Sequence, residues 1–140
     1  MSNDNDRLAV EIGENQTRYG RVLGGAARQY MLRVYMRFIN ESPQLVTIKR
    51  LGVALDRAPL DPLLILGPSL PVLLTSKGQE QLRTDKIYSA PFALPPGTVS
   101  ERYAFFFLPA DFDHELSSLS FAATVTFSTH EKVIPFVVKR

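Results

Sequence analysis

The residues best suited to chemistry lie in one acidic segment, Asp111-Phe112-Asp113-His114-Glu115. Three carboxylates and an imidazole within five residues are ligand types that Ca²⁺ or a transition metal accepts. The segment departs from the EF-hand pattern, because Leu116 stands where that loop needs glycine and Ala122 where it needs glutamate. The metal candidates are therefore Asp111, Asp113 and Glu115, but the interpretation we favour is a solvated loop whose aspartates bond nearby amides.

Catalytic patterns are missing elsewhere in the chain. There is no cysteine, which excludes disulfides, thiolate metal sites and a cysteine nucleophile. Neither histidine has a nucleophile motif around it, and no Gly-x-Ser-x-Gly, P-loop or dinucleotide pattern occurs. The dipeptides His114-Glu115 and His130-Glu131 are separated by a predicted strand whose nine residues would span roughly 30 Å. We therefore predict a protein that is not an enzyme and has no cofactor or metal.

A second group of candidate residues is rich in arginine and tyrosine and lies near the N-terminus. Positions 15–40 carry five arginines and no acidic residue, although the formal net charge of the chain is only +2. Arginine binds phosphates bidentately and tyrosine stacks on bases, which is compatible with nucleic acid. Alternatively, these cations cover apolar surface and discourage edge pairing of a strand. The partner-binding candidates in this segment are Arg18, Tyr19, Arg21 and Arg28.

A third group lies in a leucine-rich segment over residues 59–74, which four prolines interrupt. Proline at this density excludes a long helix and a central strand. The segment either packs over the core of its own chain or exposes apolar surface that a partner buries. Its partner-binding candidates are Leu63, Leu64, Ile65 and Leu66.

Strands must position these residues, since a period of two dominates the sequence. From Leu119 to Phe127 apolar residues alternate with small polar ones, and residues 133–138 return, which predicts a hairpin with Pro135 on a sheet edge. Residues 30–38 predict a long half-buried strand. We expect it to form a second hairpin with residues 45–55, whose alternation slips at Lys49-Arg50, where a β-bulge would restore a single buried face.

Composition and pattern together predict one all-β domain. The chain has 140 residues, of which 45% are hydrophobic, and its ten prolines and eight glycines suit many short strands. We predict an antiparallel β-sandwich with an Ig-like arrangement and about seven to nine strands. Residues 1–29 are expected to form a flexible or extended N-terminal arm with a possible short strand, and residues 30–140 the sandwich.

The layout of the turns supports the Ig-like arrangement. A strand closing in Asn40-Glu41-Ser42-Pro43, a Val/Ile-rich strand, and Leu94-Pro95-Pro96-Gly97 before a further strand follow one another in the chain. This order resembles bacterial Ig-like accessory domains over about residues 30–108. The resemblance implies the fold and carries over no functional residue.

The function that these observations favour is a non-catalytic protein-protein interaction or assembly module, a structural subunit of a larger complex or a homo-oligomer. One alternative is a sandwich that binds carbohydrate or a small ligand through its five tyrosines, although tryptophan is missing. The other is a nucleic-acid-associated protein that uses the arginine-rich segment. The polar, acidic first residues, the absence of cysteine and the lack of an apolar run long enough for a bilayer predict a cytoplasmic location or a complex assembled there.

Overall fold

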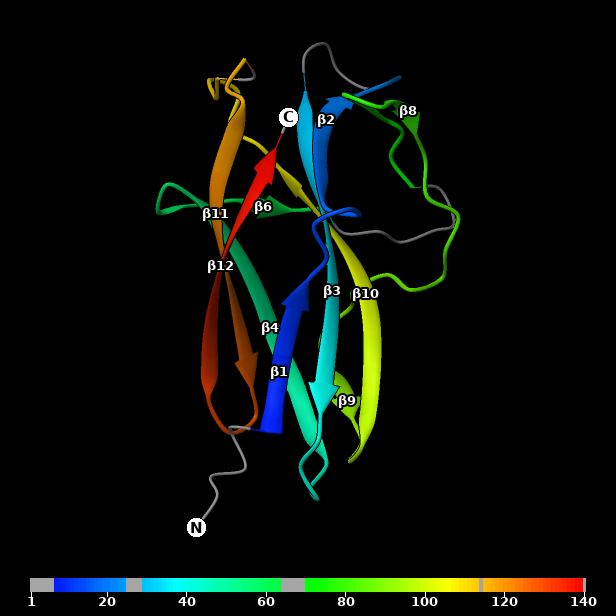
Figure 1. Ribbon diagram of the computed structural model, residues 1–140, viewed down its shortest axis with the longest axis vertical. Coiled ribbons are helices and arrows are strands. Elements are labelled where there is room, and N and C mark those ends of the chain that lie inside the picture. Colours follow the sequence, from blue (N-terminus) through cyan, green and yellow to red (C-terminus); the bar gives the residue numbers. More distant parts are fainter. Residues whose placement is uncertain (1–6, 25–28, 64–69, 114, 140) are drawn as a thin grey trace.

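The chain folds into two antiparallel β-sheets that face each other, as a β-sandwich does (Figure 1). The computed structural model describes residues 7–24, 29–63, 70–113 and 115–139. No helix long and apolar enough to cross a membrane occurs in these ranges. The elements of the described residues are all strands, which confirms the all-β class that the sequence predicts.

The described residues form twelve strands, more than the seven to nine expected, because five very short strands lie in segments without alternation. Their bounds are β1 (Leu8–Ile12), β2 (Arg18–Val22), β3 (Tyr30–Asn40), β4 (Val46–Leu55), β5 (Ala58–Pro59), β6 (Asp61–Pro62), β7 (Leu73–Thr75), β8 (Gly78–Glu80), β9 (Phe92–Leu94), β10 (Thr98–Phe107), β11 (Ser118–Phe127) and β12 (Glu131–Lys139).

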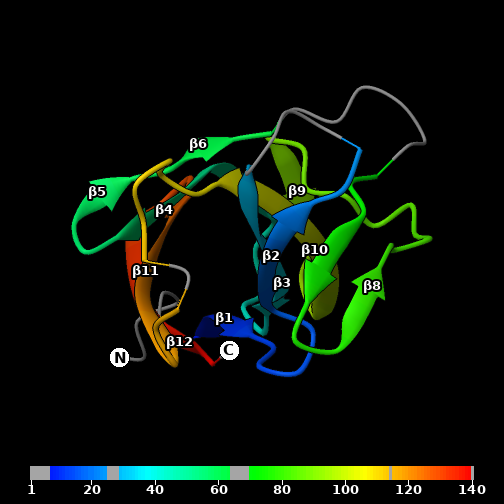
Figure 2. The ribbon, with the colours of Figure 1, turned by 90° about the horizontal axis from the view of Figure 1, so that it is seen from above.

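The seven-stranded sheet has the order β6-β10-β3-β2-β7-β8, with β1 also paired to β3, and the five-stranded sheet has the order β12-β11-β4-β5, with β9 also paired to β4. Viewed from above, β11 and β4 stand on one side of the sandwich and β3 and β10 on the other (Figure 2). The main core fills the space between them, and its largest fully buried side chains include Phe38, Ile48 and Phe127.

The predicted C-terminal hairpin is confirmed. β11 pairs with β12 from Ser118 opposite Lys139 to Thr126 opposite Glu131. Strand β12 has no second neighbour among the described strands, so Pro135 lies on a sheet edge, where its missing backbone N–H leaves no ladder bond unmade.

The slip in the alternation of β4 is a β-bulge, as predicted. Thr126 pairs with Arg50 and Phe127 with Ile48, which leaves Lys49 as the extra residue. The bulge brings Ile48 and Val53, which have opposite parity in the sequence, to the same buried face.

The predicted hairpin between residues 30–40 and 45–55 is wrong, because β3 and β4 belong to different sheets. At the end of β3, both polar atoms of the fully buried Asn40 side chain are hydrogen-bonded. Its Nδ2 donates to the carbonyls of Gln44 (2.8 Å) and Leu94 (2.9 Å), and its Oδ1 accepts from the backbone N (2.9 Å) and Oγ (2.6 Å) of Ser42. Since Leu94 belongs to β9 of the other sheet, this amide ties the end of β3 across the sandwich.

The expectation of a separate N-terminal arm is also corrected. β1 pairs with the C-terminal half of β3 and β2 with its N-terminal half, so both strands are part of the seven-stranded sheet. Leu8 and Tyr19 are buried in the main core, which explains why this glycine-rich segment adopts strands despite its weak alternation.

The C-terminal part of strand β10 is buried on both faces, as its consecutive phenylalanines indicate. Phe106 contributes to the main core, whereas Phe105 joins a second cluster on the outer face of the seven-stranded sheet. That cluster also contains Met31, Leu70 and Leu73. The described residues between β6 and β9, which include Leu70 and Leu73, therefore cover part of this outer face with apolar side chains.

Candidate functional site

The acidic segment forms an exposed turn between β10 and β11. The side chains of Asp111, Asp113 and Glu115 are exposed, and Asp113 Oδ1 accepts a hydrogen bond from the backbone N of Glu115 at 3.0 Å. His114 lies outside the described residues. Among the residues that the structure describes, no group of three His, Cys, Asp or Glu residues is placed to hold a metal ion. The local bond to a backbone amide is the arrangement expected of a connecting loop.

Phe112 anchors this loop to the sandwich. Its ring meets Tyr19 and Tyr30 edge-on, with centroid distances of 6.0 and 4.9 Å. The hydroxyl of Tyr19 donates to the carbonyl of Leu116 at 3.3 Å. Tyr19 therefore holds the end of the loop, and it also lines a cavity.

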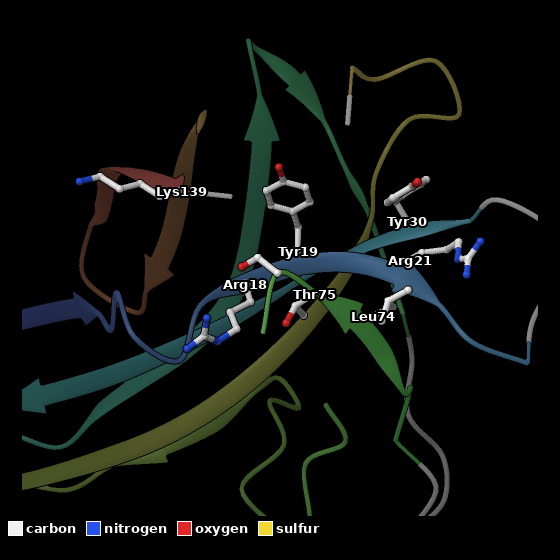
Figure 3. A pocket seen from close by; sticks show the side chains of 8 residues that line it. Arg18, Tyr19, Arg21, Tyr30, Leu74, Thr75 and Lys139 are labelled. Carbon is white, nitrogen blue, oxygen red and sulfur yellow. The ribbon is translucent and has the colours of Figure 1, made fainter. Parts of the chain in front are cut away.

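Three of the predicted partner-binding residues meet at that cavity, which has a volume of about 350 Å³ and lies between β2, β7 and the end of β12 (Figure 3). Arg18 and Tyr19 extend to opposite sides of β2, because consecutive side chains of a strand alternate. Their polar groups therefore do not converge on one point. The lining consists of Arg18, Tyr19, Arg21, Tyr30, Leu74, Thr75, Ser76 and Lys139.

The charge of this cavity is partly neutralised within the chain. Glu80 lies 3.3 Å from Arg18 Nε and 3.7 Å from the guanidinium of Arg33. Arg33 is buried, which lowers its pKa, while Glu80 acts in the opposite direction. Arg21 and Lys139 are exposed and have no ion-pair partner among the described residues.

The arginine-rich segment is thus divided between several roles. Arg37 pairs with Glu11 at 3.2 Å, which adds a third internally paired arginine to Arg18 and Arg33. Arg28 lies outside the described residues. A continuous phosphate-binding surface would need these guanidinium groups unpaired and on one face. The structure instead leaves Arg21 as the exposed, unpaired arginine of this segment within the ranges described.

Where it is described, most of the leucine-rich segment packs against its own chain, although Leu74 is 39% exposed. Leu63 contacts the second cluster on the outer face of the seven-stranded sheet, and Leu60 is buried in the main core. Leu64, Ile65 and Leu66 lie outside the described residues. For Leu63, packing within the chain accounts for the apolar side chain without a partner.

The five tyrosines do not form one exposed platform. Tyr19 is buried and the other four are half-buried. Tyr35 pairs with Tyr103 and donates to Glu101 Oε1 at 2.6 Å. Tyr88, in contrast, packs with the core residue Phe38. Their separation removes the basis on which the sequence suggested carbohydrate binding.

The outer face of the five-stranded sheet has a feature that our reading of the sequence missed. The outward residues Val133 and Val137 of β12 are 63% and 51% exposed, and the exposed Pro135 lies between them. They neighbour small outward residues of β11 and β4: Thr124 and Gly52 beside Val133, Ala122 and Ala54 beside Pro135, and Ser120 beside Val137. The centre of this face therefore carries no charge.

The two ends of this row are oppositely charged. The outward residues of β12 are, in order, Glu131, Val133, Pro135, Val137 and Lys139. Neither Glu131 nor Lys139 has an ion-pair partner among the residues that the structure describes. A signal was present in the sequence, because residues 133–138 are apolar without interruption, and a strand with one solvated face alternates instead.

Comparison with known proteins gives a likeness of fold. No protein-family model matches the chain, and no curated relative matches it. Among solved structures, Northeast Structural Genomics Consortium target SoR45 is similar, with a TM-score of 0.52 and 13% sequence identity. The alignment covers 98% of this chain and 89% of that one. The two proteins therefore share the arrangement of their strands across nearly the whole chain.

Proposed function

We propose that this protein is a non-catalytic assembly module, a β-sandwich of Ig-like arrangement that associates with a second copy of itself through the outer face of its five-stranded sheet. The observation that carries the proposal is the row of outward residues on β12, which is self-complementary. Its apolar centre at Pro135 is flanked by Val133 and Val137, and its ends are Glu131 and Lys139.

A two-fold axis that passes over Pro135 and reverses the strand direction places every residue of this row opposite a complementary residue of the second copy. It places Val133 of one copy against Val137 of the other, and Glu131 of each copy against Lys139 of its mate. Such an isologous contact is the commonest way in which identical chains associate. The reverse orientation, with parallel strands, would bring like charges together at both ends.

The contact should join faces rather than edges. Extending the sheet from β12 to β12 of a second copy would need backbone donors along the edge, and Pro135 lacks one at the centre. In a face-to-face contact the proline ring is simply part of the apolar surface. Two sheets packed in this way lie about 10 Å apart.

The size of the face indicates a weak association. Nine residues of β12 extend about 30 Å, and three strands are roughly 14 Å wide, so each copy offers on the order of 400 Å². Stable specific interfaces bury about 800 Å² per partner. We therefore expect a dimer that forms and dissociates with concentration, as suits one contact among several in a larger assembly.

A charge-exchange experiment tests the proposal by sedimentation equilibrium. Glu131→Lys and Lys139→Glu should each weaken self-association several-fold, because each places like charges opposite one another at both ends of the row. The double variant should restore association, since it exchanges the charges without changing their complementarity. Lys77→Glu, at an exposed position in the turn between β7 and β8 of the other sheet, should have no effect.

Self-association that the double variant fails to restore would overturn the two-fold arrangement. A wild-type chain that remains monomeric at about 1 mM, where a contact of −4 kcal/mol would be half saturated, would overturn the proposal as a whole. We also propose that the protein acts in the cytoplasm or in a complex assembled there, since a chain without cysteine suits a reducing compartment. Imaging of a tagged chain in its own cells tests that location.

A further inference from the structure

A second cavity opens on the side of the sandwich away from β12. Its volume is about 370 Å³, and it lies between β4 and β10. Most of its lining is apolar and comes from both sheets and from the chain between them. The apolar side chains of the lining include Leu51, Pro62, Leu63, Ile87, Ala104 and Phe106.

The cavity has a structural cause in the pairing of β4. The free side of β4 pairs with β9 over Val46–Ile48 and with β5 over Ala54–Leu55. The residues between these two short partners have no strand beside them on that side among the described residues. The bulge at Lys49 falls in this interval, so the sheet is interrupted where the cavity opens.

The ionic residues in the lining are Lys49 and Arg50, and no acidic residue is among those that line it. Both are exposed, and neither has an ion-pair partner in the described part of the chain. Some other cations of the protein are paired, as Arg33 is with Glu80 and Lys86 with Glu101, whereas Arg21 and Lys139 line a different cavity. An apolar cavity bordered by two unpaired cations complements a ligand that has an apolar body and one negative charge.

We propose that this cavity binds a small aliphatic carboxylic acid, with its chain against Leu51, Ala104 and Phe106 and its carboxylate at Lys49 and Arg50. The volume lies at the lower end of the range for small-molecule sites. At roughly 30 Å³ for each water-sized group, the cavity holds a ligand of up to about twelve non-hydrogen atoms, and octanoate, which has about ten, fits within it.

The proposal is tested with octanoate as the probe and ¹H–¹⁵N chemical-shift titration of the full chain as the readout. Octanoate should bind with a dissociation constant near or below about 1 mM. It should shift the amides of Leu51, Ile87 and Ala104, whereas those of β12 should stay unchanged. Octanol, which has the same chain without the charge, and acetate, which has the charge without the chain, should each bind at least tenfold more weakly.

Two variants separate the charge from the cavity. Lys49→Gln/Arg50→Gln should weaken octanoate binding at least tenfold and leave octanol unaffected, whereas Lys77→Gln should change neither. Ala104→Leu fills part of the cavity and should weaken both probes, provided that its circular dichroism matches the wild type. Absence of shifts at the lining residues, or equal binding by wild type and the Lys49→Gln/Arg50→Gln variant, would overturn the proposal.

Discussion

Replacing Asn40 with alanine should lower the free energy of unfolding by about 4 kcal/mol. Its side chain makes four hydrogen bonds, two donated to the carbonyls of Gln44 and Leu94 and two accepted from Ser42. A hydrogen bond within a folded protein contributes about 1 kcal/mol net, so the four together give that figure. The amide is 0% exposed, and water therefore cannot replace the lost partners without rearrangement.

The aspartate variant separates hydrogen bonding from packing. Asn40→Asp keeps the shape of the side chain but replaces the amide donor with an oxygen that faces two carbonyl oxygens at 2.8 and 2.9 Å. If the position matters through its volume, this variant should be nearly neutral. If it matters through its donors, the loss should equal or exceed that of alanine, because a buried carboxylate also carries a desolvation penalty.

The assay is urea unfolding followed by far-ultraviolet circular dichroism, since the chain has no tryptophan. With an m-value near 2 kcal/mol/M, a loss of about 4 kcal/mol lowers the unfolding midpoint by about 2 M. Ser42→Ala, which removes one hydroxyl from the network, should cost about 1–2 kcal/mol and stays measurable if Asn40→Ala does not fold. The exposed neighbour Glu41→Ala should stay within about 0.5 kcal/mol of the wild type.

The reasoning is refuted if both Asn40 variants unfold within 1 kcal/mol of the wild type, because the tie between the sheets would then contribute less than a single ordinary hydrogen bond.

Three further predictions concern single positions. Gly20→Ala should lower the free energy of unfolding in urea by about 1–3 kcal/mol, because the new Cβ would clash with the backbone oxygen of Leu74. The matched Gly52→Ala meets nothing within 4 Å and should be neutral or slightly stabilising, and equal effects of the two substitutions would contradict this prediction. Arg57→Gly should raise the free energy of unfolding by about 1 kcal/mol, because Arg57 has a φ of 68° in the β4–β5 turn and glycine adopts that conformation without strain. A loss of stability would show instead that contacts of the Arg57 side chain stabilise the turn. Burial raises the pKa of Tyr88 to about 12 from its ordinary value of 10, so the folded state holds this proton more tightly than the unfolded state does. The free energy of unfolding should therefore fall as the pH rises from about 10 to 12. In unfolding experiments at a series of pH values, Tyr88→Phe should remove that part of the fall, and an unchanged pH dependence would contradict the assignment.

What the sequence predicts well is the face on which a side chain lies. The alternation from Leu119 to Phe127 identifies the inward residues of β11, and its slip at Lys49 locates the bulge in β4. Both follow from the period of two, which is a local property of a strand. The edge position of Pro135 also follows from local chemistry, because proline lacks a backbone donor.

What the sequence does not specify is which strands are neighbours. Alternation gives the same signal for a hairpin and for a passage between sheets, so β3 and β4 were expected to pair although they belong to opposite sheets. The buried amide of Asn40 decides between the two, and its partner Leu94 is 54 residues away. A turn-forming asparagine with serine two residues later gives no hint of that distant partner.

For the candidate sites too, the sequence indicates what depends on neighbouring residues and does not indicate what depends on contacts between distant strands. Arg18, Tyr19 and Arg21 were identified as a group by their proximity in the chain, and they do line one cavity. The contribution of Lys139 to that cavity, and of Ala104 to the cavity beside Lys49, depends on contacts between distant strands. The uninterrupted apolar run at residues 133–138 indicates the exposed row on β12, but only when the sheet order is known and shows that β12 lies at an edge.

The repeated passage of the chain between the two sheets has a consequence for the order of folding events. Successive strands change sheet at β3–β4, β5–β6, β8–β9, β9–β10 and β10–β11, so most pairings join residues far apart in the chain. Such topologies fold slowly, because long loops must close before contacts form. During synthesis, β4 has no long partner until β11 emerges some sixty residues later. In a nascent chain that stalls before Ser118, the edge of β4 that later pairs with β11 therefore has no partner, and only the short strands β5 and β9 are available to the other edge.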